Sequence, residues 1–280
     1  MRLGGQVFTE TNGPEEFVRL HREAGFTACV CPWHLRPGGS ENREWKEALA
    51  QADLLLAEVG AWCNPLSPDP EEAKAAYDRL VERLALAEEL GAVTCVNIIG
   101  SRHPEHWHGP HAGNFTEDFF FEAVEVYRRA LDEVGPKTTR LSFEMMPHNF
   151  LDTAERYREF LNVLNRERAG VHLDFANTVR TPREFYNNVV HFGNAVTLLG
   201  SDVVTVHLKD LALEEDSPVV RFREVPVGEG GLDYIHLLKL LDSLPPDLPC
   251  LLEHLPDAQG YAKAARALRR LAEEAGVQVR

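Results

Sequence analysis

Short apolar runs alternate with longer amphipathic segments from one end of the chain to the other. Eight runs rich in β-branched and apolar residues are predicted to be strands: 2–9, 28–33, 54–62, 92–100, 140–146, 170–176, 203–210 and 249–255. Between them, apolar residues recur at intervals of three and four, which predicts helices at 70–90, 116–134, 153–165, 182–199, 232–241 and 258–275. This alternation predicts a parallel sheet whose strands are joined by helical crossovers.

The length of the chain indicates how these units are arranged. Eight strand–helix units in 280 residues average 280/8 = 35 residues each, which matches one (β/α)8 barrel. A doubly wound open sheet would show the same alternation, but no GxGxxG or GxxxxGK[ST] turn follows a strand here. The glycine-rich stretch 227–231 is interpreted as a loop after the seventh strand. No Pro/Gly/Ser-rich linker divides the chain, so we predict the α/β class, with residues 1–280 forming a single (β/α)8 TIM barrel.

Composition excludes some classes of partner. The chain has 44 acidic residues against 29 lysines and arginines, a formal charge of −15, whereas nucleic-acid phosphates are held by clustered basic residues. We therefore expect no nucleic-acid partner. The sequence has no run of about 18 apolar residues and no secretory leader, so we expect a cytoplasmic protein without membrane contact. Five cysteines without a CxxC motif are expected to be reduced thiols of the core.

Four of the last predicted strands carry a titratable residue near their C-terminal ends. These residues are Glu144, Asp174, His207 and Glu253. Barrel strands are covered on both sides and normally consist of apolar residues, so a charged side chain there is costly without a partner. Because side chains alternate along a strand, all four face the barrel axis if their apolar neighbours face the helices.

A cation among these groups would explain the pattern. Three buried carboxylates would repel one another or become protonated unless a positive charge lay between them. Three oxygen donors and one imidazole suit one divalent ion such as Mn²⁺, Mg²⁺ or Co²⁺, and the absence of thiolates argues against structural zinc. Alternatively, each residue is a separate buried group paired with backbone or an arginine. Matching positions in successive strands favour the metal site.

Other residues could complete a binding site. Glu58 and Trp62 share one face of the third strand and could bind a polyol, although Glu58 could instead pair with an arginine. Lys209 lies two residues after His207, so its side chain is expected to point to the same face. It could hold a substrate oxygen or phosphate, or form an ion pair with a ligand carboxylate. The loop 101–115, with four histidines and Trp107, is either a lid or a set of scattered exposed residues, and a second metal site there is less favoured. His254 is expected to pack beneath helices or to orient a neighbour.

In combination these motifs resemble the xylose-isomerase-like barrel superfamily, often labelled sugar phosphate isomerase/epimerase. The resemblance spans the chain and rests on FEMMP around Glu144, LDFAN around Asp174, HLKD (207–210), VPVGEGGLDY (225–234) and LLEH (251–254). It implies a metal-dependent enzyme in which the four positions named above hold one divalent ion. That ion is expected to be Mn²⁺, with Mg²⁺, Co²⁺ or Zn²⁺ as alternatives. The resemblance also implies that Glu144 and Glu253 flank the substrate and move its protons.

The chain departs from this family's patterns at several positions. Many members have a histidine three residues after the aspartate, where this chain has Asn177, which can hydrogen-bond a hydroxyl but cannot titrate near neutral pH. The AP endonucleases of the same family have a His-rich trinuclear zinc site. Asn177, Asn97 at the fourth strand and the lack of an Asp-x-His pair in the stretch 225–231 all argue against that function.

The leading expectation is a metal-dependent sugar or sugar phosphate isomerase/epimerase that acts through an enediolate, with Glu144 and Glu253 as its two proton carriers. The first alternative is a dehydratase of an inosose or dehydroshikimate type, and the second is a sugar-binding barrel without catalysis. The expected partner is a small sugar or polyol, and a homo-oligomer is compatible with the sequence. The sequence does not distinguish a phosphorylated substrate from a free one.

Overall fold

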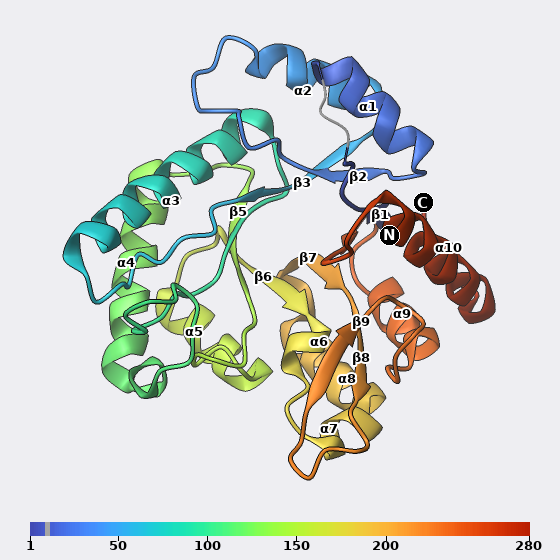
Figure 1. Cartoon of the computed structure of the whole chain (residues 1–280). Helices are drawn as coiled ribbons and strands as arrows, with labels where there is room; N and C mark the ends of the chain where they lie inside the picture. Colours follow the sequence, from blue (N-terminus) through green and yellow to red (C-terminus); the bar gives the residue numbers. More distant parts are fainter. Residues whose placement is uncertain (9–11) are drawn as a thin grey trace.

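Parallel strands close into a barrel in the order β1–β10–β7–β6–β5–β4–β3–β2, with helices around it (Figure 1). The computed structural model describes residues 1–8 and 12–280. The barrel strands are β1 (Arg2–Gly4), β2 (Ala28–Val30), β3 (Leu55–Gly60), β4 (Thr94–Asn97), β5 (Arg140–Glu144), β6 (Ala169–Asp174), β7 (Val203–Leu208) and β10 (Pro249–Leu252). The predicted α/β class and (β/α)8 barrel are therefore confirmed.

Most strands are shorter than the apolar runs that predicted them. The run 2–9 contributes only Arg2–Gly4, and its last residue lies outside the described residues. The run 170–176 ends as a strand at Asp174, whose carboxylate caps the short helix α6 (Phe175–Thr178). The C-terminal part of such a run thus leaves the barrel wall and enters the loops, where barrel active sites are built.

Several of the outer helices have clear end signals. The outer helices are α1 (Pro14–Glu23), α2 (Asn42–Gln51), α3 (Pro70–Leu90), α4 (Glu117–Val134), α5 (Ala154–Leu164), α7 (Pro182–Tyr186), α8 (Asn188–Leu199), α9 (Tyr234–Asp242) and α10 (Ala258–Ala275). At α3, Asp69 accepts two backbone N–H bonds at the start and Gly91, with φ 75°, ends the helix. The prediction of one helix over 182–199 was wrong in one respect. The backbone of Asn187 is not helical, so the segment forms two helices, α7 and α8.

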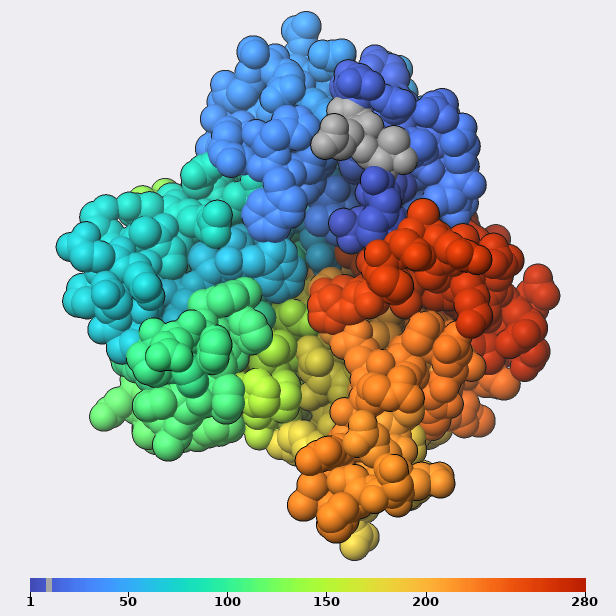
Figure 2. Space-filling view, viewed as in Figure 1, coloured from blue at the N-terminus to red at the C-terminus, as the bar shows by residue number. Residues whose placement is uncertain are grey.

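A two-stranded antiparallel hairpin interrupts the barrel pattern after β7. It consists of β8 (Asp210–Leu213) and β9 (Phe222–Val225), with Asp210 opposite Val225. The run 203–210 was predicted to be one strand, but β7 ends at Leu208. The hairpin projects from the barrel as a separate lobe (Figures 1 and 2). It brings Glu224, which no strand pattern had singled out, to the end of the barrel.

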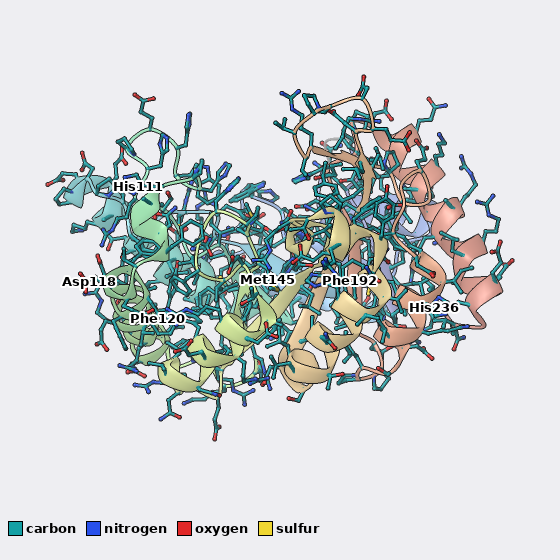
Figure 3. All side chains as sticks on the ribbon, turned by 90° about the horizontal axis from the view of Figure 1, so that it is seen from below. His111, Asp118, Phe120, Met145, Phe192 and His236 are labelled. Atoms are coloured by element: carbon teal, nitrogen blue, oxygen red, sulfur yellow. The ribbon has the colours of Figure 1, made fainter. Side chains whose placement is uncertain are left out.

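The core lies mainly between the barrel and its helices. Large side chains such as Phe120 of α4 and Phe192 of α8 are fully buried there (Figure 3). The five cysteines are buried free thiols, as expected. Within the described part of the chain, no helix is long and apolar enough to span a bilayer.

Candidate metal centre

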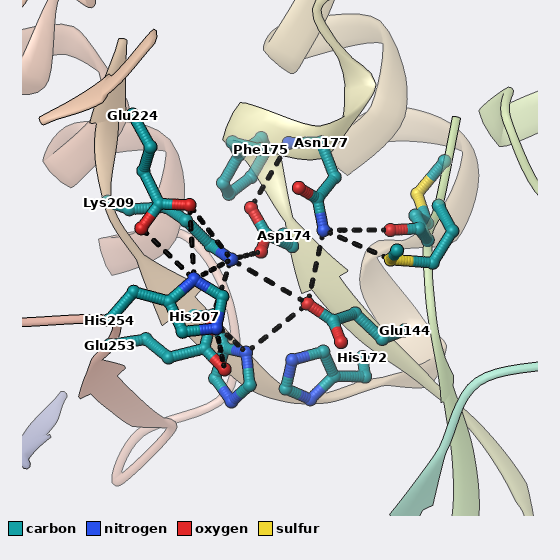
Figure 4. Close-up of polar contacts among 12 residues, drawn as sticks. Glu144, His172, Asp174, Phe175, Asn177, His207, Lys209, Glu224, Glu253 and His254 are labelled. Carbon is teal, nitrogen blue, oxygen red and sulfur yellow. Dashed lines mark hydrogen bonds and ion pairs between the residues drawn. The ribbon is translucent and has the colours of Figure 1, made fainter. Parts of the chain in front are cut away.

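The four predicted ligands converge at the end of the barrel. Glu144 ends β5, Asp174 ends β6, His207 lies in β7 and Glu253 follows β10. Strand pairing places Asp174 beside His207, and His207 beside Leu251, two residues before Glu253. One ligand atom from each of the four residues lies within 4.8 Å of the others (Figure 4). The structure therefore brings together the four residues that the alternation of side chains along the strands predicted to face the barrel axis.

Three buried atoms of this cluster make no regular hydrogen bond, although Lys209 Nζ lies 2.6 Å from two of them. Asp174 Oδ2, His207 Nδ1 and Glu253 Oε2 are buried and have no hydrogen-bond partner of normal geometry. The other oxygen of Asp174 accepts the backbone N–H of Asn177 at 3.2 Å, so only Oδ2 is directed inward. Unsatisfied buried acceptors are costly, and a coordinated cation satisfies such atoms at once. The donor set therefore fits one divalent ion held by Glu144, Asp174, His207 and Glu253.

Contacts on the far side of the ring fix the orientation of His207. Its Nε2 lies 3.4 Å from Glu58 Oε2, while its Nδ1 lies 3.0 Å from Glu253 Oε2. Glu58 is 1% exposed, and its Oε1 accepts the hydroxyl hydrogen of Thr205 at 2.8 Å. Because a carboxylate only accepts, the contact with Glu58 holds a proton on Nε2, and the contact with Glu253 likewise favours a proton on Nδ1 that a bound ion would have to displace. A carboxylate behind a ligand histidine is the usual arrangement at metal sites.

Glu58 also contacts a buried histidine that the sequence analysis missed. His172 Nδ1 lies 3.2 Å from Glu58 Oε1, and Glu58, His172 and His207 form a second group of potential ligands that shares His207. Burial opposes ionisation of Glu58, but His207 and His172 outweigh it and lower the pKa of this carboxyl well below its ordinary value. His172 precedes Asp174 by two residues, so both side chains point to the same face of the strand. That spacing could have identified His172 as a member of the site. The substrate-binding role of Glu58 stays a prediction, and its contacts favour support of His207.

Crowded charges shift the pKa values of the ligands. Burial opposes protonation of the His207 ring, yet the Glu253 and Glu58 carboxylates raise its pKa well above the ordinary value. Burial, together with the negative charges of Glu144 and Glu253, raises the pKa of Asp174 to about 7, although the positive charge of Lys209 lowers it. Protons would thus compete with a metal ion for the atoms that face the cluster.

Lys209 lies among the ligand carboxylates. Its Nζ is 2.6 Å from Asp174 Oδ2, 2.6 Å from Glu253 Oε2 and 3.8 Å from Glu224 Oε2. Burial disfavours the ammonium, but Asp174 and Glu253 outweigh this effect and raise the pKa of Lys209. Of the two interpretations of Lys209, the contacts agree with the ion pair, and a contact with substrate stays a prediction.

Asn177 adjoins the cluster from α6. Its Nδ2 donates to Glu144 Oε1 at 3.1 Å and to the Met145 carbonyl at 3.2 Å. The same side chain lines a cavity, so it could hold a hydroxyl as well as a ligand carboxylate. Its substrate-binding role stays a prediction.

Two cavities meet this cluster on either side of Trp62. One of about 380 Å³ is lined by Glu58, His207 and Glu253 together with Trp33. The other, of about 360 Å³, is lined by Trp62, Ile98, Trp107, His108, Glu144, Met146, Asn177, Lys209, Glu224, Glu253 and His254. Each provides an apolar wall and a polar floor, which is typical of a small-molecule site.

The loop 101–115 forms part of the second cavity through Trp107 and His108. Figure 3 shows the part of the loop that carries His111 and the β8–β9 hairpin rising from the same end of the barrel. This position is compatible with the predicted lid. Among the described residues, the loop histidines form no group of three potential ligands, so the structure offers no support for a second metal site there.

His254 does not pack beneath helices, and that part of its prediction was wrong. Its side chain is 59% exposed, its backbone has φ 55°, and it lies at the mouth of the site. Both oxygens of Glu224 lie 3.1 Å from its Nδ1, and Glu253 Oε1 lies 3.4 Å from its Nε2. The β8–β9 hairpin and the turn after β10 therefore build one wall of the site together.

Comparison with known proteins places this geometry in a family. The family described as "Xylose isomerase-like TIM barrel" matches residues 18–271. A curated relative, "Putative L-ribulose-5-phosphate 3-epimerase SgbU" of Haemophilus influenzae, is 26% identical over 129 residues, which cover 46% of this chain and 42% of the relative. The match thus covers less than half of that relative's length.

Solved structures share the fold over nearly the whole chain. An L-ribulose 3-epimerase has a TM-score of 0.69 at 17% identity, covering 98% of this chain and 97% of its own. Endonuclease IV of Thermus thermophilus has a TM-score of 0.72 at 19% identity, covering 98% and 100%. A probable 3-DHS dehydratase, AsbF, of Bacillus anthracis has 0.67 at 14%, covering 96% and 98%. At these identities the similarity shows the fold and does not select one reaction.

Proposed function

Because the chain belongs to the xylose isomerase-like TIM barrel family, we propose that it is an isomerase or epimerase of a small polyhydroxylated carbonyl compound and depends on one divalent ion, Mn²⁺ before Mg²⁺, Co²⁺ or Zn²⁺. The observation that carries this proposal is the convergence of four potential ligands within 4.8 Å, in which three buried atoms, Asp174 Oδ2, His207 Nδ1 and Glu253 Oε2, make no hydrogen bond of normal geometry. The expected partner is a small sugar or polyol.

In this proposal Glu144 and Glu253 carry the protons. An ion held by the four ligands would supply charge stabilisation for an enediolate. Glu144 belongs to β5 and Glu253 follows β10, so their carboxylates approach the centre from different sides of the barrel. Epimerisation requires a base on one face of the carbon and an acid on the other. One glutamate removes the proton next to the carbonyl, and the other returns a proton to the opposite face.

Neighbouring side chains orient these two carboxylates. Asn177 donates to Glu144 Oε1 at 3.1 Å, which limits the rotation of that carboxylate. Glu253 directs Oε2 to the cluster and Oε1 toward His254 Nε2 at 3.4 Å, so the two oxygens have different surroundings. The Trp62 and Trp107 rings line the same cavity and would exclude water from the reacting carbon.

Exchange of a carbon-bound proton with solvent deuterium tests this function. Ketoses, inososes and sugar phosphates are incubated with the protein and Mn²⁺ in D₂O, and exchange and products are followed by NMR. An isomeric sugar labelled next to the carbonyl is expected. Loss of water with a new conjugated absorbance would indicate the dehydratase instead, because the same enediolate can expel a β-hydroxyl. A ligand that raises the melting temperature without any exchange would indicate a sugar-binding barrel.

Substitutions separate proton carriers from pure ligands. Glu144→Gln and Glu253→Gln keep an oxygen for the metal but lose the group that accepts a proton, so each is expected to lower kcat by about 10²–10⁴-fold with a smaller loss of metal. Asp174→Asn is expected mainly to weaken metal binding, with partial rescue by excess Mn²⁺. Glu229→Gln, whose carboxylate pairs with Lys263 outside the cluster, is the matched control. Near wild-type turnover in both metal-loaded Gln variants would contradict the assignment.

A further inference from the structure

Lys209 and His254, which line the proposed site, both face carboxylates. Among the described residues that line the two cavities bordering the cluster, Lys209 is the one lysine or arginine, while Arg79 lines a third cavity that adjoins Trp62 and Trp107. Lys209 Nζ lies 2.6 Å from both Asp174 Oδ2 and Glu253 Oε2. The ring of His254 faces Glu224 with Nδ1 and Glu253 with Nε2. An incoming anion would have to displace a carboxylate from one of these partners.

The glycine-rich turn after the hairpin is also occupied. In (β/α)8 barrels, backbone N–H groups of the loops after strands seven and eight often hold a phosphate. Here the Asp210 carboxylate accepts the backbone N–H of Gly228 at 3.1 Å, Gly230 at 3.0 Å and Leu232 at 3.1 Å. It also accepts the N–H of Leu211 at 2.8 Å. Asp210 is 1% exposed, so the donors that could hold a phosphate point to an internal carboxylate.

Glu224 adds negative charge to the wall of the same cavity. It comes from β9, its side chain is 35% exposed, and its Oε2 lies 3.8 Å from Lys209 Nζ (Figure 4). Glu144, Glu224 and Glu253 all line this cavity. Like charges brought together at a binding site weaken binding, whereas a neutral hydroxyl can donate to a carboxylate.

Building on the proposed function, we propose that the site accepts an uncharged sugar or polyol and rejects the phosphorylated form, with Glu224 as the residue that sets this preference. The hydroxyl groups of a free sugar can donate to Glu224 while Lys209 and His254 keep their contacts with that carboxylate. A phosphate dianion at this wall would meet the Glu224 charge and would have to compete with it for Lys209 and His254. The inference concerns the charge of the substrate and holds for any reaction at this centre.

Matched pairs of substrates test the inference. Ketopentoses and ketohexoses, each compared with its own terminal phosphate ester, are titrated into the Mn²⁺-loaded protein by calorimetry and assayed for deuterium exchange. The free sugar is expected to bind at least about tenfold more tightly than its ester, and kcat/KM is expected to follow the same order. Tighter binding or faster exchange of the esters would overturn the inference and leave the proposed epimerase intact.

Binding and exchange also separate this inference from the proposed function. Free sugars that bind without exchange support the inference and contradict the epimerase. If neither member of any pair binds or exchanges, both proposals fail.

A charge substitution tests the part played by Glu224. Glu224→Gln removes the charge and is expected to reduce the preference for the free sugar by about threefold to tenfold, and Glu224→Lys by more. Glu229→Gln, which removes an exposed carboxylate from the nearby turn, is expected to leave the preference unchanged. Melting curves confirm that the hairpin variants are folded. An unchanged preference in both Glu224 variants would refute the assignment of this residue.

Discussion

At the scale of single residues, one buried contact determines how the proposed metal would be held. Glu58 and His207 are separated by 149 positions in sequence, yet their Oε2 and Nε2 atoms lie 3.4 Å apart. Thr205 and His172 contact the other oxygen of Glu58. Carboxylates face both ring nitrogens, with Glu144 and Glu253 on the Nδ1 side. When an ion replaces the Nδ1 proton, Glu58 would keep the remaining proton on Nε2.

Glu58→Gln is expected to lower the affinity for Mn²⁺ by about 10–100-fold, the usual effect of removing such a supporting carboxylate. The amide can present either a donor or an acceptor to Nε2, so the ring is no longer restricted to one tautomer. Titration calorimetry with Mn²⁺ measures the effect, and excess Mn²⁺ is expected to restore activity. Glu82→Gln, an exposed residue paired with Arg36, serves as the control. Equal affinities in the Glu58 variant and the wild type would show that Glu58 has no supporting role.

At the scale of elements, the turn after the hairpin is held by one side chain. Asp210, the first residue of β8, accepts four backbone N–H groups, three of them from the glycine-rich segment 228–232. Gly230 lies so close that an added Cβ would be 2.3 Å from both Asp210 Oδ1 and the Leu211 carbonyl oxygen. This close approach, and not a left-handed backbone, explains the glycine. The hydrogen bonds of Asp210 join the first residue of the hairpin that carries Glu224 to the turn that follows it.

Two Gly→Ala substitutions are expected to change stability in opposite directions. Gly230→Ala must push the turn away from Asp210 and is expected to cost about 1–3 kcal/mol. Gly193→Ala lies within α8, where the nearest atom to an added Cβ is Leu240 Cδ2 at 3.9 Å. It is expected to stabilise the fold by about 0.5–1 kcal/mol, because alanine loses less backbone entropy in a helix. Chemical denaturation measures both. A neutral Gly230→Ala would contradict the close packing of the turn.

At the scale of the whole molecule, the proposed centre links strands that are distant in sequence. Its ligands come from β5, β6 and β7 and from the residue after β10, so a bound ion would join four parts of the barrel wall. The pKa shifts give this link a pH dependence. The raised pKa values of His207 and Asp174 stabilise the metal-free fold at low pH, and that contribution is lost as pH rises through them. Metal binding needs the deprotonated atoms and gains strength over the same range.

Mn²⁺ is therefore expected to raise the melting temperature more at pH 8 than at pH 5.5. At 100-fold excess over Kd, one bound ion adds about 2.7 kcal/mol, which amounts to several degrees for a chain of this size. Scanning calorimetry with Mn²⁺ and with a chelator measures the difference. His207→Gln is expected to abolish the effect. His236→Gln, which alters an exposed histidine paired with Asp233, is expected to keep it. A shift independent of pH would contradict competition between protons and metal.

Much of the architecture is determined by local sequence patterns. Apolar runs of strand length, separated by segments with helical periodicity, were sufficient to predict the barrel, because side-chain spacing in strands and helices is a local property. The alternation of side chains along each strand was sufficient to predict that four residues face one point: Glu144, Asp174, His207 and Glu253. The ends of the strands were not predictable in the same way. Asp174 ends β6 because its carboxylate caps α6, and β7 ends before Lys209 because the chain turns into a hairpin.

Tertiary structure decided which polar groups are paired and which are not. The sequence left two interpretations of Lys209 open, a substrate contact and an ion pair, and interpreted the glycine-rich stretch 227–231 as a loop. Only the fold brings Lys209 between Asp174 and Glu253, and the turn onto Asp210. Glu224 had no signal in the pattern, since its role arises from the hairpin that carries it to His254. Periodicity determines the direction of a side chain from its own strand, whereas its partner depends on contacts across many residues that no local pattern records.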